Sequence, residues 1–157
     1  MSAELTIMDG GMGGELIRRG FPSGGLWSAK ALLEKPEVVR AVHEDYVNAG
    51  AQVIITNSYS TVPSYLAKEN MEARYVELTG IAARLAREVA DAAATEVKVA
   101  GCVPPLSESY RPDLVPPDDE ARPIYAEIVK ALATNVDLYI CETMSSVREA
   151  VNAASSV

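Results

Sequence analysis

Four short segments of this 157-residue chain each stand at the end of an apolar run, and together they carry residue types that bind small polar molecules. They are Asp9-Gly10-Gly11, Thr56-Asn57-Ser58-Tyr59, residues 102–107 and Glu142-Thr143. If the apolar runs are parallel strands, their carboxyl ends meet at one edge of the sheet, where the ligands of such folds bind. Two carboxylates, several hydroxyl groups, an amide and a tyrosine would then gather into a site for a small polar molecule.

The first of these segments combines a carboxylate with two glycines. The Asp9 carboxylate could accept hydrogen bonds from an ammonium group, and Gly10 and Gly11 would let the backbone approach that ligand closely. Asp9 could equally be an ordinary turn or helix-capping residue. The run GGMGG is not a clean GxGxxG and lacks the Lys-Ser/Thr pair of a P-loop, so it does not predict a nucleotide site.

Glu142 and Tyr59 are the other two side chains with a possible binding role. Glu142 directly follows an apolar run, where an unpaired carboxylate is costly, so it could bind a ligand, pair with an arginine or cap the next helix. Tyr59 could contact a ligand or be a packed aromatic residue. His43, the only histidine, lies inside a predicted helix and away from the strand ends, which favours a structural role over catalysis.

Other kinds of site find no support in the sequence. Cys102 and Cys141 match no CxxC pattern, and we interpret both as small buried residues. Two cysteines alone cannot form a zinc site, which needs three or four ligands. The chain also has neither a GxSxG nor an HExxH motif, so it is not predicted to be a hydrolase of those kinds.

An alternation of strands and helices must position these residues. Short apolar or β-branched runs predict strands at residues 5–8, 51–56, 97–102 and 137–141. Apolar residues spaced three and four apart predict helices at residues 36–48, 71–89 and 124–135. A fourth helix is predicted from Ser145 onward, with Ser145 or Ser146 as its N-cap.

The order of these elements, with mostly apolar strands, predicts an α/β fold in which helices cover a parallel sheet. Two architectures fit this order. One is a small doubly wound sheet, and the other is the first half, about four βα units, of a (β/α)₈ barrel, for which about 250 residues is typical. Spacing alone does not choose between them.

The composition disfavours several classes of partner. The chain has 14 Lys and Arg against 22 Asp and Glu, and its net charge of −8 would repel the phosphates of nucleic acids. No apolar run approaches the roughly 20 residues that cross a bilayer. The segment MSAELTIMDGG lacks the features of a signal peptide. We therefore expect a cytoplasmic protein with neither nucleic acid nor membrane as a partner.

The polar segments and their surroundings resemble the homocysteine S-methyltransferase family, which includes the betaine-dependent enzymes. The matching segments run along almost the whole chain: MDGGMGGELIRRG, LWSAKALLEKPEVVRAVHEDYVNAGAQVIITNSYSTVP, AGCVPPLSESYRP and DLYICETMSSVREA. The resemblance implies a (β/α)₈ TIM barrel. Residues 1–157 would form the N-terminal half of this homocysteine-binding barrel.

The resemblance also implies roles for individual residues. Asp9-Gly10-Gly11 resembles the first-strand loop that holds the amino-acid end of homocysteine, and Glu142 resembles the fourth-strand glutamate that contacts the same amino group. Tyr59 is similar to a tyrosine near the sulfur and donor pocket. Thr56 and Asn57 would line the opening of the same pocket.

The resemblance further implies a zinc ion, held by three cysteine thiolates from Gly-x-Asn-Cys and Gly-Gly-Cys-Cys segments. Neither segment occurs in residues 1–157, and Cys102 and Cys141 match no ligand position, so the zinc ligands are expected outside this chain. The implied reaction transfers a methyl group from a sulfonium or betaine-type donor to the zinc-activated thiolate of homocysteine and gives methionine.

Half a barrel would leave two sheet edges with unpaired backbone groups. We therefore expect a C-terminal half, a partner chain that supplies it, or self-association into a homo-oligomer. The alternative function is that of a truncated, non-catalytic half-barrel that acts as a binding or self-associating module.

Overall fold

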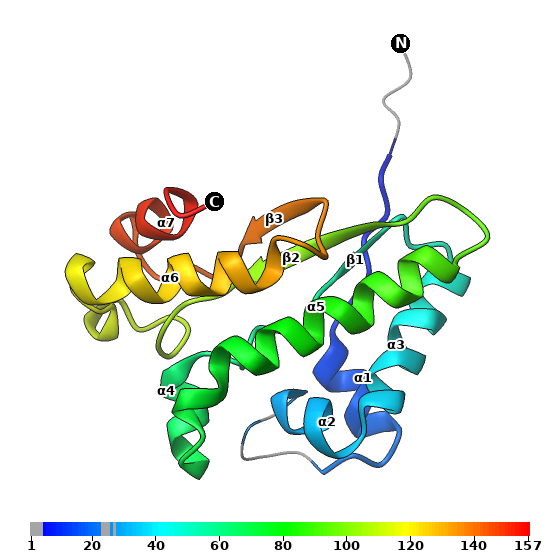
Figure 1. Cartoon of the computed structure of the whole chain (residues 1–157), viewed down its shortest axis with the longest axis horizontal. Helices are drawn as coiled ribbons and strands as arrows, with labels where there is room; N and C mark the ends of the chain where they lie inside the picture. The colour runs from blue at the N-terminus through cyan, green and yellow to red at the C-terminus, as the bar shows by residue number, and fades with distance from the viewer. Residues whose placement is uncertain (1–4, 23–25, 27) are drawn as a thin grey trace.

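The computed structural model describes residues 5–22, 26 and 28–157, and its centre is a parallel sheet (Figure 1). The sheet has the order β1 (Val53–Ile55), β2 (Lys98–Val103) and β3 (Leu138–Cys141). Val53 pairs with Lys98 across the first ladder, and Ala100 pairs with Leu138 across the second. The predicted α/β fold with a parallel sheet is confirmed in this part of the chain.

The predicted strand at residues 5–8 is not a strand but a single parallel bridge between Met8 and Val53. Gln52 N donates to Ile7 O at 2.8 Å, and Asp9 N donates to Val53 O at 2.9 Å. Leu5 is 79% exposed, so its side chain adds little packing that would extend the pairing. The predicted four βα units are therefore three strands preceded by this bridged segment.

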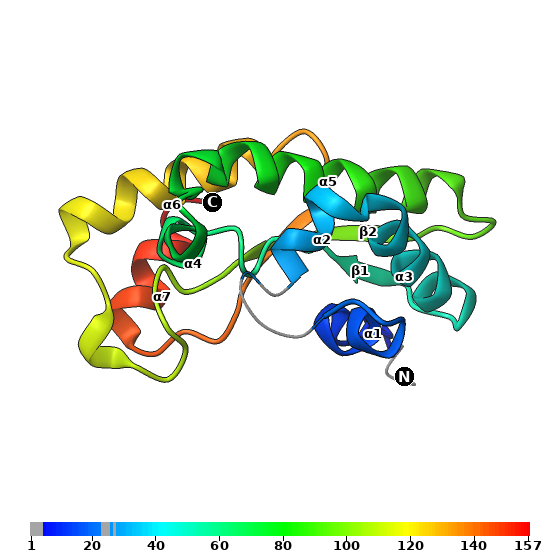
Figure 2. The same ribbon diagram turned by 90° about the horizontal axis from the view of Figure 1, so that it is seen from below.

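The long helices cover the sheet in the order in which they occur along the chain. They are α3 (Pro36–Asn48), α5 (Tyr75–Ala92), α6 (Asp118–Leu132) and α7 (Val147–Ala154). Each of them packs against the next. Figure 2 shows α5 and α6 on one side of the sheet and α1 (Met12–Arg18) on the other.

The predicted helices agree with the structure to different degrees. The helix predicted at residues 36–48 is confirmed as α3. The predicted helix at 71–89 begins as a 3₁₀ turn, Glu72–Arg74, before α5. The helix predicted at 124–135 begins six residues earlier, at Asp118. The short helices were not predicted: α1, α2 (Ser28–Glu34) and α4 (Pro63–Leu66), with 3₁₀ turns at Ala67–Glu69 and Pro112–Leu114.

The order of neighbours in the sheet distinguishes the two architectures that spacing left open. The Met8 segment, β1, β2 and β3 lie side by side in chain order. A doubly wound sheet reverses its strand order at a switch point, and the described strands do not. Consecutive parallel neighbours are the arrangement within a (β/α)₈ barrel.

The helix predicted from Ser145 onward is α7. Its N-cap is Ser146 and not Ser145, because Ser146 Oγ accepts a hydrogen bond from Glu149 N at 3.2 Å. Within the described residues, no helix has the length and apolar character that a membrane crossing requires.

Candidate functional site

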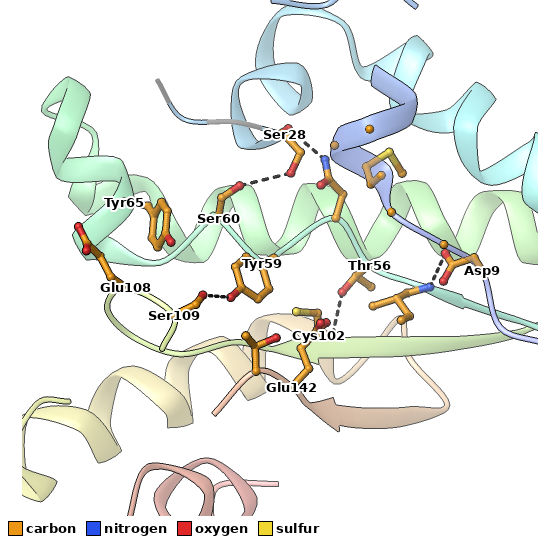
Figure 3. A pocket seen from close by; sticks show the side chains of 18 of the residues that line it. Asp9, Ser28, Thr56, Tyr59, Ser60, Tyr65, Cys102, Glu108, Ser109 and Glu142 are labelled. Atoms are coloured by element: carbon orange, nitrogen blue, oxygen red, sulfur yellow. Dashed lines mark hydrogen bonds between the residues drawn. The ribbon is translucent and has the colours of Figure 1, made fainter. Parts of the chain in front are cut away.

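A cavity of about 800 Å³ lies where the strands end (Figure 3). The seven residues singled out from the sequence all line it: Asp9, Gly10, Gly11, Thr56, Asn57, Tyr59 and Glu142. They come from the segment after Met8 and from the loops that follow β1 and β3, with Cys102 of β2 between them. The carboxyl ends of the parallel strands therefore bring these residues together.

Asp9 is held at the edge of the sheet with one carboxylate oxygen left unpaired. Its Oδ2 accepts a hydrogen bond from Ile55 N at 2.9 Å, whereas Oδ1 is buried without a partner in the described part of the chain. Burial, with a smaller contribution from the charge of Glu142, raises the pKa of Asp9 to about 6. The helix-capping interpretation is wrong, because the N-cap of α1 is Gly11.

His43 lies directly behind this carboxylate. The side chain projects from α3, is fully buried, and places Nδ1 3.9 Å from Asp9 Oδ2. Neither ring nitrogen has a hydrogen-bond partner among the residues that the structure describes. Burial lowers the pKa of His43 to about 4, so the ring is neutral at pH 7. The sequence signal for this burial is helical spacing, because His43 shares the apolar stripe of Val39 and Tyr46.

Gly10 has a packing role that the sequence did not indicate. A Cβ atom at this position would lie 2.9 Å from the hydroxyl oxygen of Tyr46, a residue of α3. A larger residue at position 10 would therefore require the Tyr46 side chain to shift. At Gly11, by contrast, nothing lies within 4 Å of the corresponding position.

Thr56 and Asn57 form the wall of the cavity through hydrogen bonds to other elements. Thr56 Oγ1 accepts from Cys102 N at 2.9 Å, which joins the end of β1 to β2. Asn57 Nδ2 donates to Ser28 O at 3.0 Å and so holds the start of α2. Both residues are buried. The hydrogen bonds of Thr56 and Asn57 therefore hold this wall of the cavity in place.

The end of the cavity remote from Asp9 is lined by tyrosines (Figure 3). The hydroxyl groups of Tyr59 and Ser109 form a hydrogen bond that ties the loop after β1 to the loop after β2. Lys68 Nζ lies 4.6 Å from the ring centroid of the neighbouring Tyr65. The sequence does not predict Ser109, Tyr65 and Lys68 as site residues, because none of them directly follows a strand.

Glu142 extends the β3 ladder by one residue, with its N donating to Val103 O at 3.3 Å. Among the described residues no ion pair includes Glu142, and the next helix is capped by Ser146. Both structural interpretations of this carboxylate are therefore wrong. Thr143 has φ of 58°, a left-handed conformation that turns the chain immediately after Glu142.

The sequence model of a family described as homocysteine S-methyltransferase matches residues 6–157. This chain belongs to the homocysteine S-methyltransferase family. The resemblance expected from the sequence segments is thus confirmed.

Individual members of the homocysteine S-methyltransferase family give the extent of the similarity. The chain is 35% identical to the homocysteine S-methyltransferase of Escherichia coli (strain K12), over 93% of this chain and 52% of that protein. It is 34% identical to an S-methylmethionine–homocysteine S-methyltransferase of Rattus norvegicus, over 96% of this chain and 39% of that protein. The chain therefore spans about half the length, or less, of these curated relatives.

Solved structures of the same family share the fold. The metallated form of the homocysteine methyltransferase MmuM from Escherichia coli matches with a TM-score of 0.85 and 34% identity. That match covers 98% of this chain and 59% of the other. The apo form matches with a TM-score of 0.75 and 32% identity, over 99% of this chain and 55% of the other.

The metallated relative raises the question of which residues here could hold a metal. In the ranges that the structure describes, no three His, Cys, Asp or Glu side chains form a possible ligand group. Burial raises the pKa of both Cys102 and Cys141, which keeps them as thiols, whereas zinc binds thiolates. The described residues therefore do not fit a zinc site by themselves.

Proposed function

We propose that this chain is part of an enzyme that transfers a methyl group from a small donor to homocysteine and so forms methionine. In this proposal residues 1–157 supply the amino-acid-binding loops of a (β/α)₈ barrel, and the barrel is completed by strands outside these residues. The proposal rests on two carboxylates, Asp9 and Glu142, which line the same cavity and lie near enough for the charge of Glu142 to raise the pKa of Asp9.

The carboxylate pair supports the binding of the ammonium group of an amino acid. Asp9 Oδ1 is a buried acceptor that lacks a donor in the described structure, and leaving such a group unpaired costs about 1–3 kcal/mol. The negative charge of Glu142 acts on Asp9 and raises its pKa. An ammonium group between the two would supply the missing donor and offset their repulsion.

The opposite end of the cavity supports a cationic methyl donor. Sulfonium and quaternary-ammonium groups are attracted to the faces of aromatic rings, as ammonium groups are. Lys68 Nζ lies 4.6 Å from the ring centroid of Tyr65, so a cation is already held by an aromatic ring in this part of the cavity. S-methylmethionine, which is named for the relative from Rattus norvegicus, is a sulfonium compound of this kind.

The acceptor in this proposal is the homocysteine sulfur. A zinc ion, when bound by ligands outside the described residues, would keep that sulfur as a thiolate at neutral pH. The part of the reaction assigned to this chain is to fix the amino-acid end at Asp9 and Glu142 and to direct the sulfur toward the tyrosine-lined end. No observation on the described residues favours a non-catalytic binding module instead.

The test is the formation of methionine by the full-length protein. Homocysteine is incubated with S-methylmethionine or betaine, and methionine is measured by mass spectrometry. We expect methionine with at least one donor, and no S-methylcysteine when cysteine replaces homocysteine as the acceptor. The absence of methyl transfer to homocysteine from either type of donor would contradict the proposal.

A further inference from the structure

The Asp9–His43 contact contains three buried polar atoms that lack partners within the described residues: Asp9 Oδ1 and the two ring nitrogens of His43. The exposed fraction of the Asp9 side chain is 4%, and that of the His43 side chain is 0%. Buried polar groups in folded proteins are nearly always hydrogen-bonded, so an unpaired set beside a cavity needs an explanation. The substrate-binding role proposed above explains Oδ1 but leaves the histidine unexplained.

We infer that His43 is a positioning residue: its Nδ1–H donates to Asp9 Oδ2 when ligand binds and leaves Oδ1 to receive the ammonium group. This inference rests on the proposed function, since it takes Asp9 as the ammonium-binding carboxylate. His43 itself does not line the cavity and acts only through Asp9.

Only a small movement of the His43 and Asp9 side chains is needed to form this hydrogen bond. The atoms Nδ1 and Oδ2 are 3.9 Å apart, and a hydrogen bond from nitrogen to oxygen needs about 2.7–3.2 Å. A neutral imidazole carries one N–H and one acceptor nitrogen, so the tautomer with the proton on Nδ1 can donate to the carboxylate. Oδ2 already accepts from Ile55 N, which fixes the direction in which Oδ1 faces.

Ligand binding strengthens this contact through the charge of Asp9. Without ligand, burial and the charge of Glu142 raise the pKa of Asp9 to about 6, so below this pH the carboxyl group is largely protonated and is a weaker acceptor. An ammonium group at Oδ1 favours the ionised form, and hydrogen bonds to ionised acceptors are roughly twice as strong as neutral ones. The His43 contact and the ligand therefore stabilise each other.

The other titratable groups near Asp9 and His43 are the same in every variant of His43, so they affect the pKa of Asp9 equally in all of them. Glu142 after β3 and Tyr46 of α3 both interact with the charge of Asp9, and Cys102 of β2 lies beside Glu142. None of them changes when His43 is substituted. A shift in the pH dependence between variants of His43 therefore reports the loss of its own N–H.

The test compares His43→Leu, which has no donor, with His43→Gln, which retains an N–H. Homocysteine affinity of the full-length protein should fall at acid pH as Asp9 becomes protonated. In His43→Leu this midpoint should move up by about one pH unit, and the Kd at pH 7 should rise about tenfold. His43→Gln should recover most of the wild-type affinity and midpoint.

A matched control separates positioning from loss of packing. Val39→Ala creates a cavity on the same buried face of α3 and should lower the Tm without moving the pH midpoint. Equal midpoints in wild-type protein and His43→Leu, or equal weakening in His43→Leu and His43→Gln, would overturn the inference.

Nitrogen NMR of the wild-type protein tests the same contact without relying on a variant that folds. With homocysteine bound, the His43 ring should carry its proton on Nδ1 at pH 7, and the signal is identified by its loss in His43→Gln. A proton on Nε2 alone would overturn the inference. If Asp9→Asn leaves homocysteine affinity unchanged, the proposed function fails, whereas the NMR spectrum still reports whether His43 contacts Asp9.

Discussion

At the scale of single residues, the side chains that line the cavity divide into those with polar atoms already in use and those with atoms to spare. Thr56 and Asn57 have hydrogen bonds to β2 and to the start of α2. Asp9 has one oxygen bonded to Ile55 N and one without a partner in the described part of the chain. Substitutions should therefore affect ligand binding at Asp9, and folding at Thr56 and Asn57.

The first prediction concerns the two carboxylates. Asp9→Ala or Glu142→Ala should each raise the KM for homocysteine by roughly 10- to 100-fold, since a hydrogen bond to a charged group contributes about 1.5–3 kcal/mol. Steady-state kinetics of the full-length protein measure this effect. Asp119→Asn, an exposed carboxylate at the start of α6, is the matched control and should leave the KM unchanged. Wild-type homocysteine kinetics in both alanine variants would refute the assignment.

The second prediction separates two roles of the Tyr59 hydroxyl group. Tyr59→Phe removes both its hydrogen bond to Ser109 and any contact with the donor, whereas Ser109→Ala removes only the hydrogen bond. We expect Tyr59→Phe to raise the KM for the methyl donor about fivefold, the effect of about 1 kcal/mol, and Ser109→Ala to raise it less. The KM for homocysteine should stay constant in both, because Asp9 lies at the other end of the cavity (Figure 3). If the KM for the methyl donor is the same in the two variants, the Tyr59 hydroxyl group acts only through its hydrogen bond to Ser109.

At the scale of elements, the sequence predicted best where several local signals agree. The bounds of α3 follow from Pro36 in the first turn, an apolar stripe and Gly50 after the end, where φ is 103°. The predicted start of α6 is too late because the apolar spacing that predicts this helix begins only at Ile124. The helix instead begins after Pro117, and three acidic residues in its first turn favour that start.

The segment at residues 5–8 shows why local signals alone are insufficient. Its apolar run predicts a strand, but pairing depends on neighbours that are distant in sequence. In the described structure it pairs with the backbone of Gln52 and Val53 and with the Gln52 side chain, and Ile7 remains 55% exposed. A strand of this kind needs packing on its faces, which no periodicity within four residues can reveal.

The third prediction tests the close contact between β2 and its neighbours. A Cβ atom on Gly101 would lie 3.1 Å from Leu132 Cδ1 and 3.2 Å from Tyr139 Cδ1. Gly101→Ala should therefore destabilise the protein by about 1–3 kcal/mol in urea unfolding. Gly80→Ala is the control in α5, where nothing lies within 4 Å, and it should stabilise the helix by about 0.5–1 kcal/mol. A gain in stability from Gly101→Ala would instead mean that Leu132 and Tyr139 shift by a few tenths of an ångström to admit the methyl group.

The fourth prediction concerns the start of α7. Ser146 Oγ accepts from Glu149 N at 3.2 Å, and Glu149 Oε2 accepts from Ser145 N at 2.6 Å. This reciprocal arrangement resembles a capping box, so Ser146→Ala should cost about 0.5–2 kcal/mol of unfolding free energy. Ser155→Ala, at the exposed other end of the same helix, should change it little. Equal effects of the two substitutions would rule out a specific capping role.

At the scale of the whole molecule, the candidate site could be predicted from the sequence only where residues directly follow strands. Asp9, Tyr59 and Glu142 were found because parallel strands end at one edge. His43 belongs to a helix in the layer behind the sheet, and its approach to Asp9 appears only when α3 packs against β1. The two residues then form one buried unit whose titration affects the stability of the entire fold.

The last prediction follows from the opposite pKa shifts of these two residues. The folded-state pKa of Asp9 is raised from 3.8 to about 6, so its contribution to stability is present below about pH 4 and is lost as pH rises through about 6. The pKa of His43 is lowered from 6.5 to about 4, so its contribution is present above pH 6.5 and is lost as pH falls through about 4. Between these limits the two effects oppose each other in the wild-type protein.

Removing either group should expose the effect of the other. Relative to wild type, Asp9→Asn should gain stability as pH rises from 4 to 6, because only the histidine contribution remains. His43→Gln should show the reverse trend, because only the aspartate contribution remains. Urea unfolding at several pH values measures these differences, and the other carboxylates cancel because all three proteins share them. Parallel stability curves for the three proteins would mean that neither residue changes its proton affinity on folding, and the buried pair would then be absent in solution.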